Sequence, residues 1–164
     1  MSEEEFAVGT ALVTGAASGM GQATAAMFLD RGWRVLGLDI AANLGIDHPA
    51  LTALTVDIRD GEAVSAVVGA AVASTGIDAV ANIAGVYPPT TLQTFTDEHF
   101  RTIFDVNVLG LLHVTRAAVA HMNPGSAIVN FASVDAFTVS PGQLLYGASK
   151  AAVVMLTKEL ALEL

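Results

Sequence analysis

Apolar residues gather in short runs along the chain, and longer segments with a helical period of apolar and polar positions separate these runs. Five runs are apolar at nearly every position instead of alternating with polar residues. Such runs predict buried parallel β-strands that helices cover on both faces. The predicted strands span residues 10–14, 34–39, 51–57, 78–84 and 127–133.

Four alanine-rich segments predict helices, at residues 19–31, 61–74, 97–122 and from 145 to Leu164. We expect the third helix to begin at Thr96 or Asp97. Asp97 and Glu98 would then place negative charge in its first turn, where the helix dipole favours it.

The alternation of strands and helices indicates an α/β protein built from βαβ units. We predict a Rossmann-like, doubly wound parallel sheet with strand order 3-2-1-4-5 and helices on both faces. No linker rich in proline, glycine or serine divides the chain, so residues 1–164 are expected to form a single domain, and residues 41–50 and 86–96 are expected to be loops within it.

The composition changes this picture mainly through charge. The 164 residues are 53% hydrophobic, which is enough for a sizeable core. Acidic residues outnumber basic residues 16 to 7, for a formal net charge of −9. Such a charge repels phosphate backbones, so no nucleic-acid partner is expected.

Several chemistries lack the residues that they need. The chain has no cysteine, which excludes disulfides, thiolate catalysis and zinc–sulfur sites. The four histidines are scattered, and His113 and His121 lack the H-x-x-x-H spacing, so no metal site is predicted. The N-terminus does not resemble a secretory signal, and polar residues interrupt the apolar stretches. We therefore expect a cytoplasmic protein without a membrane partner.

A glycine-rich turn, within "ALVTGAASGMGQATAAMF", joins the first strand to the first helix through Gly15, Gly19 and Gly21. Glycines permit a sharp turn and a close approach of the backbone to a ligand, and the helix N-terminus offers free N–H groups to a pyrophosphate. The spacing G-x-x-x-G-x-G differs from the general dinucleotide fingerprint, and simple packing of the glycines is the alternative.

Asp39 ends the second predicted strand, eighteen residues after Gly21. A carboxylate there can accept hydrogen bonds from both ribose hydroxyls of an adenosine and repels a 2′-phosphate. The turn contains no arginine or lysine, and Arg34, the nearest base along the chain, lies at the opposite end of its strand. NAD is therefore favoured over NADP. The alternative for Asp39 is a solvated carboxylate at a strand end.

A second group of polar residues follows the later strands. "NIAG", at residues 82–85, follows the fourth strand, Asn107 interrupts an apolar helix, and Ser133 ends the fifth strand. Tyr146 and Lys150 lie one helical turn apart, thirteen and seventeen residues after Ser133. Because the carboxyl ends of parallel strands form the ligand-binding rim of such sheets, we expect these residues to converge there.

With "TGAASGMG", "NIAG", Asn107, Ser133 and "YGASK" in this order, the chain resembles the single-domain short-chain dehydrogenases/reductases from about residue 8 to Leu164. The resemblance implies that Tyr146 is the general acid/base and that Ser133 holds and polarises the substrate oxygen. It also implies that Lys150 binds the nicotinamide ribose and assists Tyr146, and that Asn107 anchors a proton-relay water. The cofactor-binding residues that it implies are Gly15, Ser18, Gly19, Met20, Gly21, Asp39, Asp57, Ile58, Asn82, Ala84, Gly85, Tyr146 and Lys150, with Asp57 and Ile58 next to the adenine.

The chain departs from the family pattern in two places. Ile83 replaces the second asparagine of the usual N-N-A-G, and the sequence stops at "ELALEL", where family members continue into further strands and a substrate-covering loop. We interpret the chain as C-terminally truncated. If Leu164 is the true end of the polypeptide, strand 127–133 would be an unpaired sheet margin, and this form is expected to self-associate or to require a partner, and to turn over little or no substrate.

Three functions remain open. The leading one is NAD(H)-dependent interconversion of a small secondary alcohol and its ketone by a homo-oligomer, a dimer or a tetramer. An NADPH-type 3-oxoacyl-acyl-carrier-protein reductase is the first alternative, which Asp39 disfavours, and a non-catalytic nucleotide-binding or assembly module is the second. Tyr87, Phe137 and Leu144 are candidates for an apolar substrate wall, and Asp135 is a candidate to orient a polar substituent.

Overall fold

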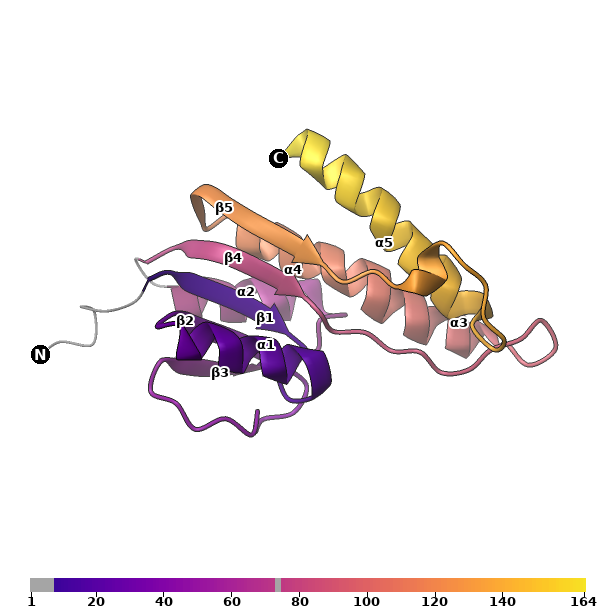
Figure 1. Ribbon diagram of the computed structural model, residues 1–164, viewed down its shortest axis with the longest axis horizontal. Coiled ribbons are helices and arrows are strands. Elements are labelled where there is room, and N and C mark those ends of the chain that lie inside the picture. Colours follow the sequence, from indigo (N-terminus) through magenta and orange to yellow (C-terminus); the bar gives the residue numbers. More distant parts are fainter. Residues whose placement is uncertain (1–7, 73–74) are drawn as a thin grey trace, which may run out of the picture.

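The computed structural model describes residues 8–72 and 75–164, which form one parallel sheet with helices packed around it (Figure 1). The strand order is β3-β2-β1-β4-β5, so the predicted fold class and strand order are confirmed. The strands are β1 (Thr10–Thr14), β2 (Arg34–Asp39), β3 (Leu51–Thr55), β4 (Ile77–Asn82) and β5 (Met122–Asn130).

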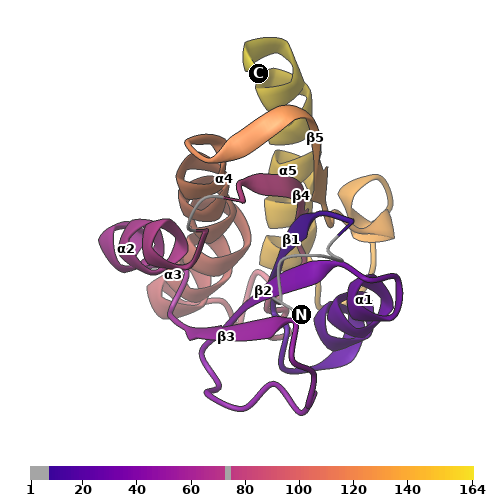
Figure 2. The same cartoon turned by 90° about the vertical axis from the view of Figure 1, so that its left-hand side faces the viewer.

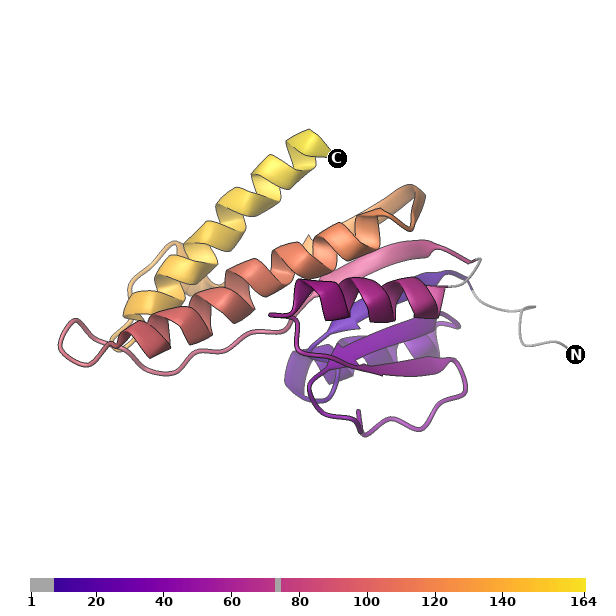
Figure 3. The same ribbon diagram turned by 180° about the vertical axis from the view of Figure 1, so that it is seen from behind.

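Helices cover both faces of the sheet. Figure 2 shows α1 on one side of the sheet and α2, α3 and α4 on the other. In the reverse view of Figure 3, α2 and α4 lie between the viewer and the sheet. The helices are α1 (Gly19–Asp30), α2 (Gly61–Val72), α3 (Asp97–Phe104), α4 (Leu111–Val119) and α5 (Leu144–Glu163), with a π-helix η1 (Asp105–Gly110) and a 3-10 turn η2 (Val134–Ala136). The last two residues of the predicted helix 61–74 lie outside the described residues.

Two hydrophobic clusters, one on each face, hold these layers together. In β1, Leu12 points into the cluster shared with α2 and α4, whereas Ala11 and Val13 point into the cluster shared with α1. Successive side chains of a strand face opposite sides, so a strand that is buried on both faces must be apolar throughout. This is why the sheet could be read from unbroken apolar runs.

The predicted helix 97–122 is wrong as a single α-helix. It consists of α3, the π-helix η1 and α4, and it ends at Val119. The start of α3 is as predicted, because the Thr96 hydroxyl accepts a hydrogen bond from the His99 N–H at 3.1 Å. The irregular turn lies where Gly110 packs closely on Ile58, since a Cβ at Gly110 would come within 2.6 Å of the Ile58 Cγ1.

The bounds of β5 also differ from the prediction. The strand begins at Met122, which pairs with Ile77, and the register shifts between Ile77 and Ala79. This irregular pairing extends the strand into a segment that contains proline and glycine, which is why its start was missed. The strand ends at Asn130 because the chain turns into η2 at Ser133.

At the margin of the sheet, β5 pairs with β4 alone among the described strands, as expected for strand 127–133. A cavity of about 440 Å³, partly lined by Ile128, Leu160 and Leu164, separates β5 from the C-terminal half of α5. Within the described part of the chain, one helical segment, Asp97–Val119, has the length and composition that a membrane crossing would need. Its inner residues belong to the core against α2 and β4, so it serves as a core helix of the domain.

Candidate dinucleotide and catalytic site

The turn after β1 depends on its glycines. Gly15 has a φ of +68°, and a Cβ at Gly21 would lie 2.0 Å from the Gly15 carbonyl oxygen. Any side chain at Gly21 would therefore push the turn away from the helix. Ser18 begins α1 without a side-chain capping hydrogen bond, and the first turn of α1 carries no acidic residue. The N–H groups of this turn are thus available to an anion.

Thr14 ties the glycine turn to the loop after β4. Its hydroxyl accepts hydrogen bonds from the N–H groups of Ile83 at 2.9 Å and Ala84 at 3.0 Å. Ala84 also lies against Gly15, where a Cβ would come within 3.1 Å of the Ala84 Cα. The sequence analysis did not identify Thr14, although its place as the last strand residue before Gly15 was a usable signal.

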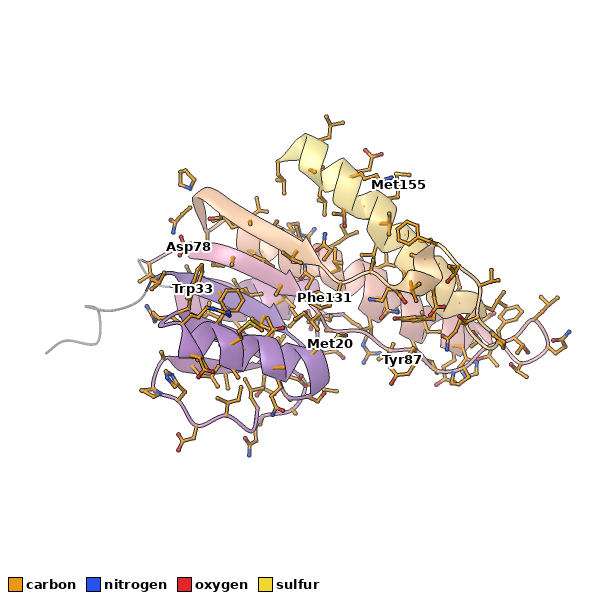
Figure 4. The ribbon with its side chains drawn as sticks, viewed as in Figure 1. Met20, Trp33, Asp78, Tyr87, Phe131 and Met155 are labelled. Carbon is orange, nitrogen blue, oxygen red and sulfur yellow. The ribbon has the colours of Figure 1, made fainter. Side chains whose placement is uncertain are left out.

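A cavity of about 340 Å³ opens at the carboxyl ends of the strands. Figure 4 shows Met20 and Phe131 at this end of the sheet, with Trp33 and Asp78 at the opposite end. Gly19, Met20 and Gly21 form the first turn of α1. Seven predicted cofactor-binding residues line the cavity: Gly15, Ser18, Asp39, Asp57, Ile58, Ala84 and Gly85.

Asp39 is fixed at the wall of this cavity by two backbone groups. Its Oδ2 accepts a hydrogen bond from the Ala17 N–H, and its Oδ1 accepts one from the Ala41 N–H, both at 3.0 Å. A carboxylate has about four acceptor positions, so each oxygen retains one for a ligand hydroxyl.

Arg59, which the sequence analysis did not identify, lines the same cavity as Asp39. Arg34, expected as the nearest base, lies at the far end of β2, where its Nη1 is 3.5 Å from the Thr75 hydroxyl. The Arg59 guanidinium forms an ion pair with Asp57 at 2.6 Å. Its hydrogen bonds hold the pKa of the Asp57 carboxyl below its ordinary value. The direction of a side chain that leaves a loop cannot be deduced from its position in the sequence.

Asn82 is a predicted cofactor residue whose side chain is buried away from the cavity. Its Nδ2 donates to the Thr115 hydroxyl at 3.1 Å and to the Asn130 Oδ1 at 2.9 Å, which braces β4 against α4 and β5. Its Oδ1 is buried without a partner among the described residues. The structure therefore gives Asn82 a supporting position beneath the loop.

Asn107 connects the loop after β4 to the helix that carries Tyr146. Its Oδ1 accepts from the Val86 N–H at 2.8 Å, and its Nδ2 donates to the Val86 carbonyl at 2.9 Å. The same Nδ2 donates to the Ser149 hydroxyl at 3.0 Å, and Ser149 donates to the Tyr146 carbonyl at 2.7 Å. Asn107 is 2% exposed, so these partners satisfy a buried amide.

Lys150 is a buried cation beneath Tyr146. Only 5% of the residue is exposed, and its Nζ lies 5.9 Å from the centre of the Tyr146 ring. The Nζ donates to the Phe131 carbonyl at 2.7 Å. Burial lowers the pKa of the Lys150 ammonium from its ordinary value of 10.5. The Tyr87 ring packs edge-on against Tyr146, with ring centres 5.9 Å apart.

Ser133 and Asp135 form a tight turn against α5. The Ser133 hydroxyl accepts from the Asp135 N–H at 3.1 Å and lies 3.4 Å from the Asp135 Oδ2. The turn presses on the helix so closely that a Cβ at Gly147 would lie 3.0 Å from the Asp135 carbonyl. Ser133 and Tyr146 are thus carried by two segments in direct contact.

Thr90 caps the start of α5 from a distant part of the chain. Its carbonyl accepts from the Leu144 N–H and its hydroxyl accepts from the Leu145 N–H, both at 3.2 Å. Gln143, at the N-terminus of this helix, supplies no side-chain cap. Thr90 thereby holds the turn that presents Tyr146. No cluster of three metal-ligating side chains occurs within residues 8–72 and 75–164.

These features, a glycine turn beside a strand-end aspartate and a Tyr–Lys pair on the rim of a parallel sheet, agree with comparisons to known proteins. A sequence profile described as short chain dehydrogenase matches residues 9–164. The chain therefore belongs to the short-chain dehydrogenase family. Its relatives include proteins named as oxidoreductases, dehydrogenases and reductases.

The particular relatives differ in substrate. The chain is 36% identical to 2-(R)-hydroxypropyl-CoM dehydrogenase of Xanthobacter autotrophicus, over 93% of this chain and 67% of that protein. It is 33% identical to the 3-oxoacyl-(acyl-carrier-protein) reductase of Thermotoga maritima, over 93% of this chain and 67% of that protein. The crystal structure of a Brucella melitensis 3-ketoacyl-(acyl-carrier-protein) reductase complexed with NADH superposes with a TM-score of 0.88 at 32% identity, over 96% of this chain and 70% of that one.

The chain spans between 63% and 67% of the length of the relatives that it matches.

Proposed function

We propose that residues 1–164 form a dinucleotide-binding and catalytic domain of an NAD(H)-dependent oxidoreductase that interconverts a small secondary alcohol and its ketone. The observation that carries this proposal is the buried Lys150 ammonium beneath the Tyr146 ring, on the strand rim that also holds the Asp39 cavity. A cation so placed favours the phenolate of a neighbouring tyrosine, which is the form that accepts a proton.

The residues present fit a dinucleotide. The first turn of α1 offers N–H groups to a pyrophosphate, and Asp39 offers its free acceptor positions to ribose hydroxyls. Asp39 would oppose a 2′-phosphate, which favours NAD over NADP. The similarity to a reductase that was crystallised with NADH supports the same choice.

When bound, the nicotinamide supplies the hydride acceptor or donor. The remaining tasks fall to side chains of this protein. Tyr146 moves the proton of the substrate hydroxyl, Ser133 holds the same oxygen, and Lys150 stabilises the phenolate and binds the nicotinamide ribose. Asn107, through Ser149, fixes the turn that carries Tyr146, and it anchors a proton-relay water.

The substrate pocket is proposed to lie between the turn after β5 and the start of α5. Phe137 and Leu144 leave large apolar side chains exposed there, and Asp135 adds a carboxylate next to Ser133. We propose a small alcohol or ketone as the substrate and a homo-oligomer as the working form.

Reduction of a 3-oxoacyl group on a carrier protein is the second candidate, because the Thermotoga maritima reductase is 33% identical over 93% of this chain. Asp39 argues against NADPH as its cofactor. Assays of small ketones and of a 3-oxoacyl thioester, each with NADH and with NADPH, separate the two candidates.

The test of the proposed function compares Tyr146→Phe with Tyr87→Phe. The two rings pack together, but only Tyr146 is assigned a transferable proton. We expect Tyr146→Phe to lower kcat at least about 100-fold with little change in the NADH dissociation constant, and Tyr87→Phe to retain turnover. Near-normal kcat in Tyr146→Phe contradicts the catalytic assignment. These variants are compared in a full-length form of the protein, and NADH binding without turnover by that form supports a non-catalytic module instead.

A further inference from the structure

Ile58 lies at the wall of the Asp39 cavity, and two parts of the chain hold it there. Its side chain packs on the π-helix η1, where a Cβ at Gly110 would come within 2.6 Å of the Ile58 Cγ1. Its backbone carbonyl accepts a hydrogen bond from the His113 Nδ1 at 3.0 Å. Because a carbonyl can only accept, the His113 ring carries a hydrogen on Nδ1.

His113 also packs against the start of α2. A Cβ at Gly61, the first residue of α2, would come within 2.9 Å of the His113 Cδ2 and 3.0 Å of its Nε2. The imidazole thus lies against both ends of the segment 58–61. Within residues 8–72 and 75–164, the Ile58 carbonyl has no other hydrogen-bond donor, so His113 alone fixes it there.

The backbone N–H of Ile58 has no hydrogen-bond partner in the described part of the chain. Ile58 is only 8% exposed, and a buried N–H without a partner costs free energy. An adenine ring presents nitrogens that accept hydrogen bonds. Since Ile58 shares the cavity wall with Asp39, its N–H is available to the base of a nucleotide whose ribose Asp39 binds.

We propose that His113 is a positioning residue for the adenine base, because it holds the Ile58 carbonyl and so keeps the Ile58 N–H in place to donate to a ring nitrogen of that base. This inference rests on the proposed dinucleotide function. A loop that is already fixed loses little conformational entropy when the ligand binds, whereas a loose loop must be ordered at that moment. His113 acts through Ile58 and does not touch the base.

The test measures binding by calorimetry in a full-length form of the protein, with four probes and no turnover. NADH, ADP-ribose and AMP contain adenine, whereas reduced nicotinamide mononucleotide does not. We expect His113→Leu, which cannot donate, to weaken the first three at least about fivefold and to leave the mononucleotide within about twofold. His121→Leu is the matched control and should change none of them, because His121 is also partly buried but packs near Gly69 of α2.

Two amide variants separate the hydrogen bond from a general loss of stability. The amide nitrogen of asparagine is bonded to Cγ, as the Nδ1 of histidine is, whereas that of glutamine lies one carbon further out. We therefore expect His113→Asn to bind the adenine-containing probes within about twofold of the wild type, and His113→Gln to bind them as weakly as His113→Leu. AMP should slow deuterium exchange of the Ile58 amide in the wild type and in His113→Asn, and less in His113→Leu.

The opposite results overturn the inference. Equal AMP affinity of the wild type and His113→Leu contradicts it and leaves the dinucleotide function intact, as does an equal loss of affinity for the mononucleotide. Equal AMP affinity of His113→Asn and His113→Gln also contradicts it, and this comparison decides if His113→Leu does not fold. Wild-type protein that binds none of the four probes contradicts the dinucleotide function and this inference with it.

Discussion

The Asn107 side chain and the Val86 backbone are joined by two reciprocal hydrogen bonds, one to the N–H and one to the carbonyl. The Asn107 side chain thus supplies both hydrogen-bond partners that a neighbouring strand would otherwise give to the Val86 backbone. Because Asn107 also donates to Ser149, it links the loop after β4 with α5 at a buried point.

Loss of this amide should destabilise the whole domain. We expect Asn107→Ala to lower the free energy of unfolding by about 2–4 kcal/mol, because the partly buried Val86 groups lose their partners and the buried hydrogen bond to Ser149 is lost as well. Urea unfolding followed by circular dichroism measures the change. Asn43→Ala removes an exposed amide whose one partner within residues 8–72 and 75–164 is the Gly45 N–H, and it should cost less than about 1 kcal/mol. Equal effects in both variants would show that the link is unimportant.

The charge of Asp39 should set the choice of dinucleotide. We expect wild-type protein to bind NADH at least about tenfold more tightly than NADPH, and Asp39→Asn to remove most of this preference, since the variant no longer repels a 2′-phosphate. Dissociation constants at one salt concentration test this, with the exposed Asp30→Asn as the control. Tighter binding of NADPH by the wild type would refute the assignment.

A methyl group at Gly21 should damage the dinucleotide turn. The added Cβ of Gly21→Ala would lie 2.0 Å from the Gly15 carbonyl oxygen, so the turn must move. We expect NADH affinity to fall at least about tenfold and stability to fall by about 1–3 kcal/mol. Gly69→Ala, in α2, is the matched control, because its Cβ meets nothing closer than the His121 Nε2 at 3.7 Å. That variant should be neutral or up to about 1 kcal/mol more stable.

Lys150 should make stability depend on alkaline pH. Its pKa is lower in the folded protein than the ordinary 10.5, so between the two pKa values the unfolded chain binds more protons. Stability therefore rises with pH across this window, just below 10.5, and the cost of burying the ammonium is fully present at lower pH.

The measurement is urea unfolding of wild-type protein and Lys150→Met at about pH 8 and about pH 10. We expect the wild type to gain stability relative to Lys150→Met at the higher pH. A relative loss at the higher pH would mean that the folded state favours the ammonium, contrary to its burial.

Much of the fold could be predicted because its determinants are local. Unbroken apolar runs such as residues 10–14 mark buried parallel strands, and Thr96 marks the start of α3 by its own hydroxyl. The π-helix η1 could not be predicted, because its causes are contacts with distant residues. Asn107 bonds Val86 and Ser149, and Gly110 packs on Ile58, and helical periodicity records none of these contacts.

In the site, too, the residues that depend on local sequence could be predicted, and those that depend on distant contacts could not. Residues such as Gly15 and Asp39 could be placed at the cavity because strand ends and sheet order determine their positions. Side-chain direction was not determined in this way, so Asn82 was expected at the cofactor whereas its side chain bonds residues of α4 and β5, and Arg59 was missed. Thr90 was missed for another reason, because it caps a residue 55 positions later in the chain.

The cap that Thr90 provides makes the start of α5 a reporter of the loop after β4. The amide hydrogens of Leu144 and Leu145 are bonded to Thr90, so they exchange with deuterium only when this loop separates from the helix. A ligand that orders residues 85–90 should slow their exchange although it touches neither amide. Ligand binding beside the loop after β4 and the capping of α5, the helix that carries Tyr146, are therefore coupled in free energy. Both depend on the same short backbone segment.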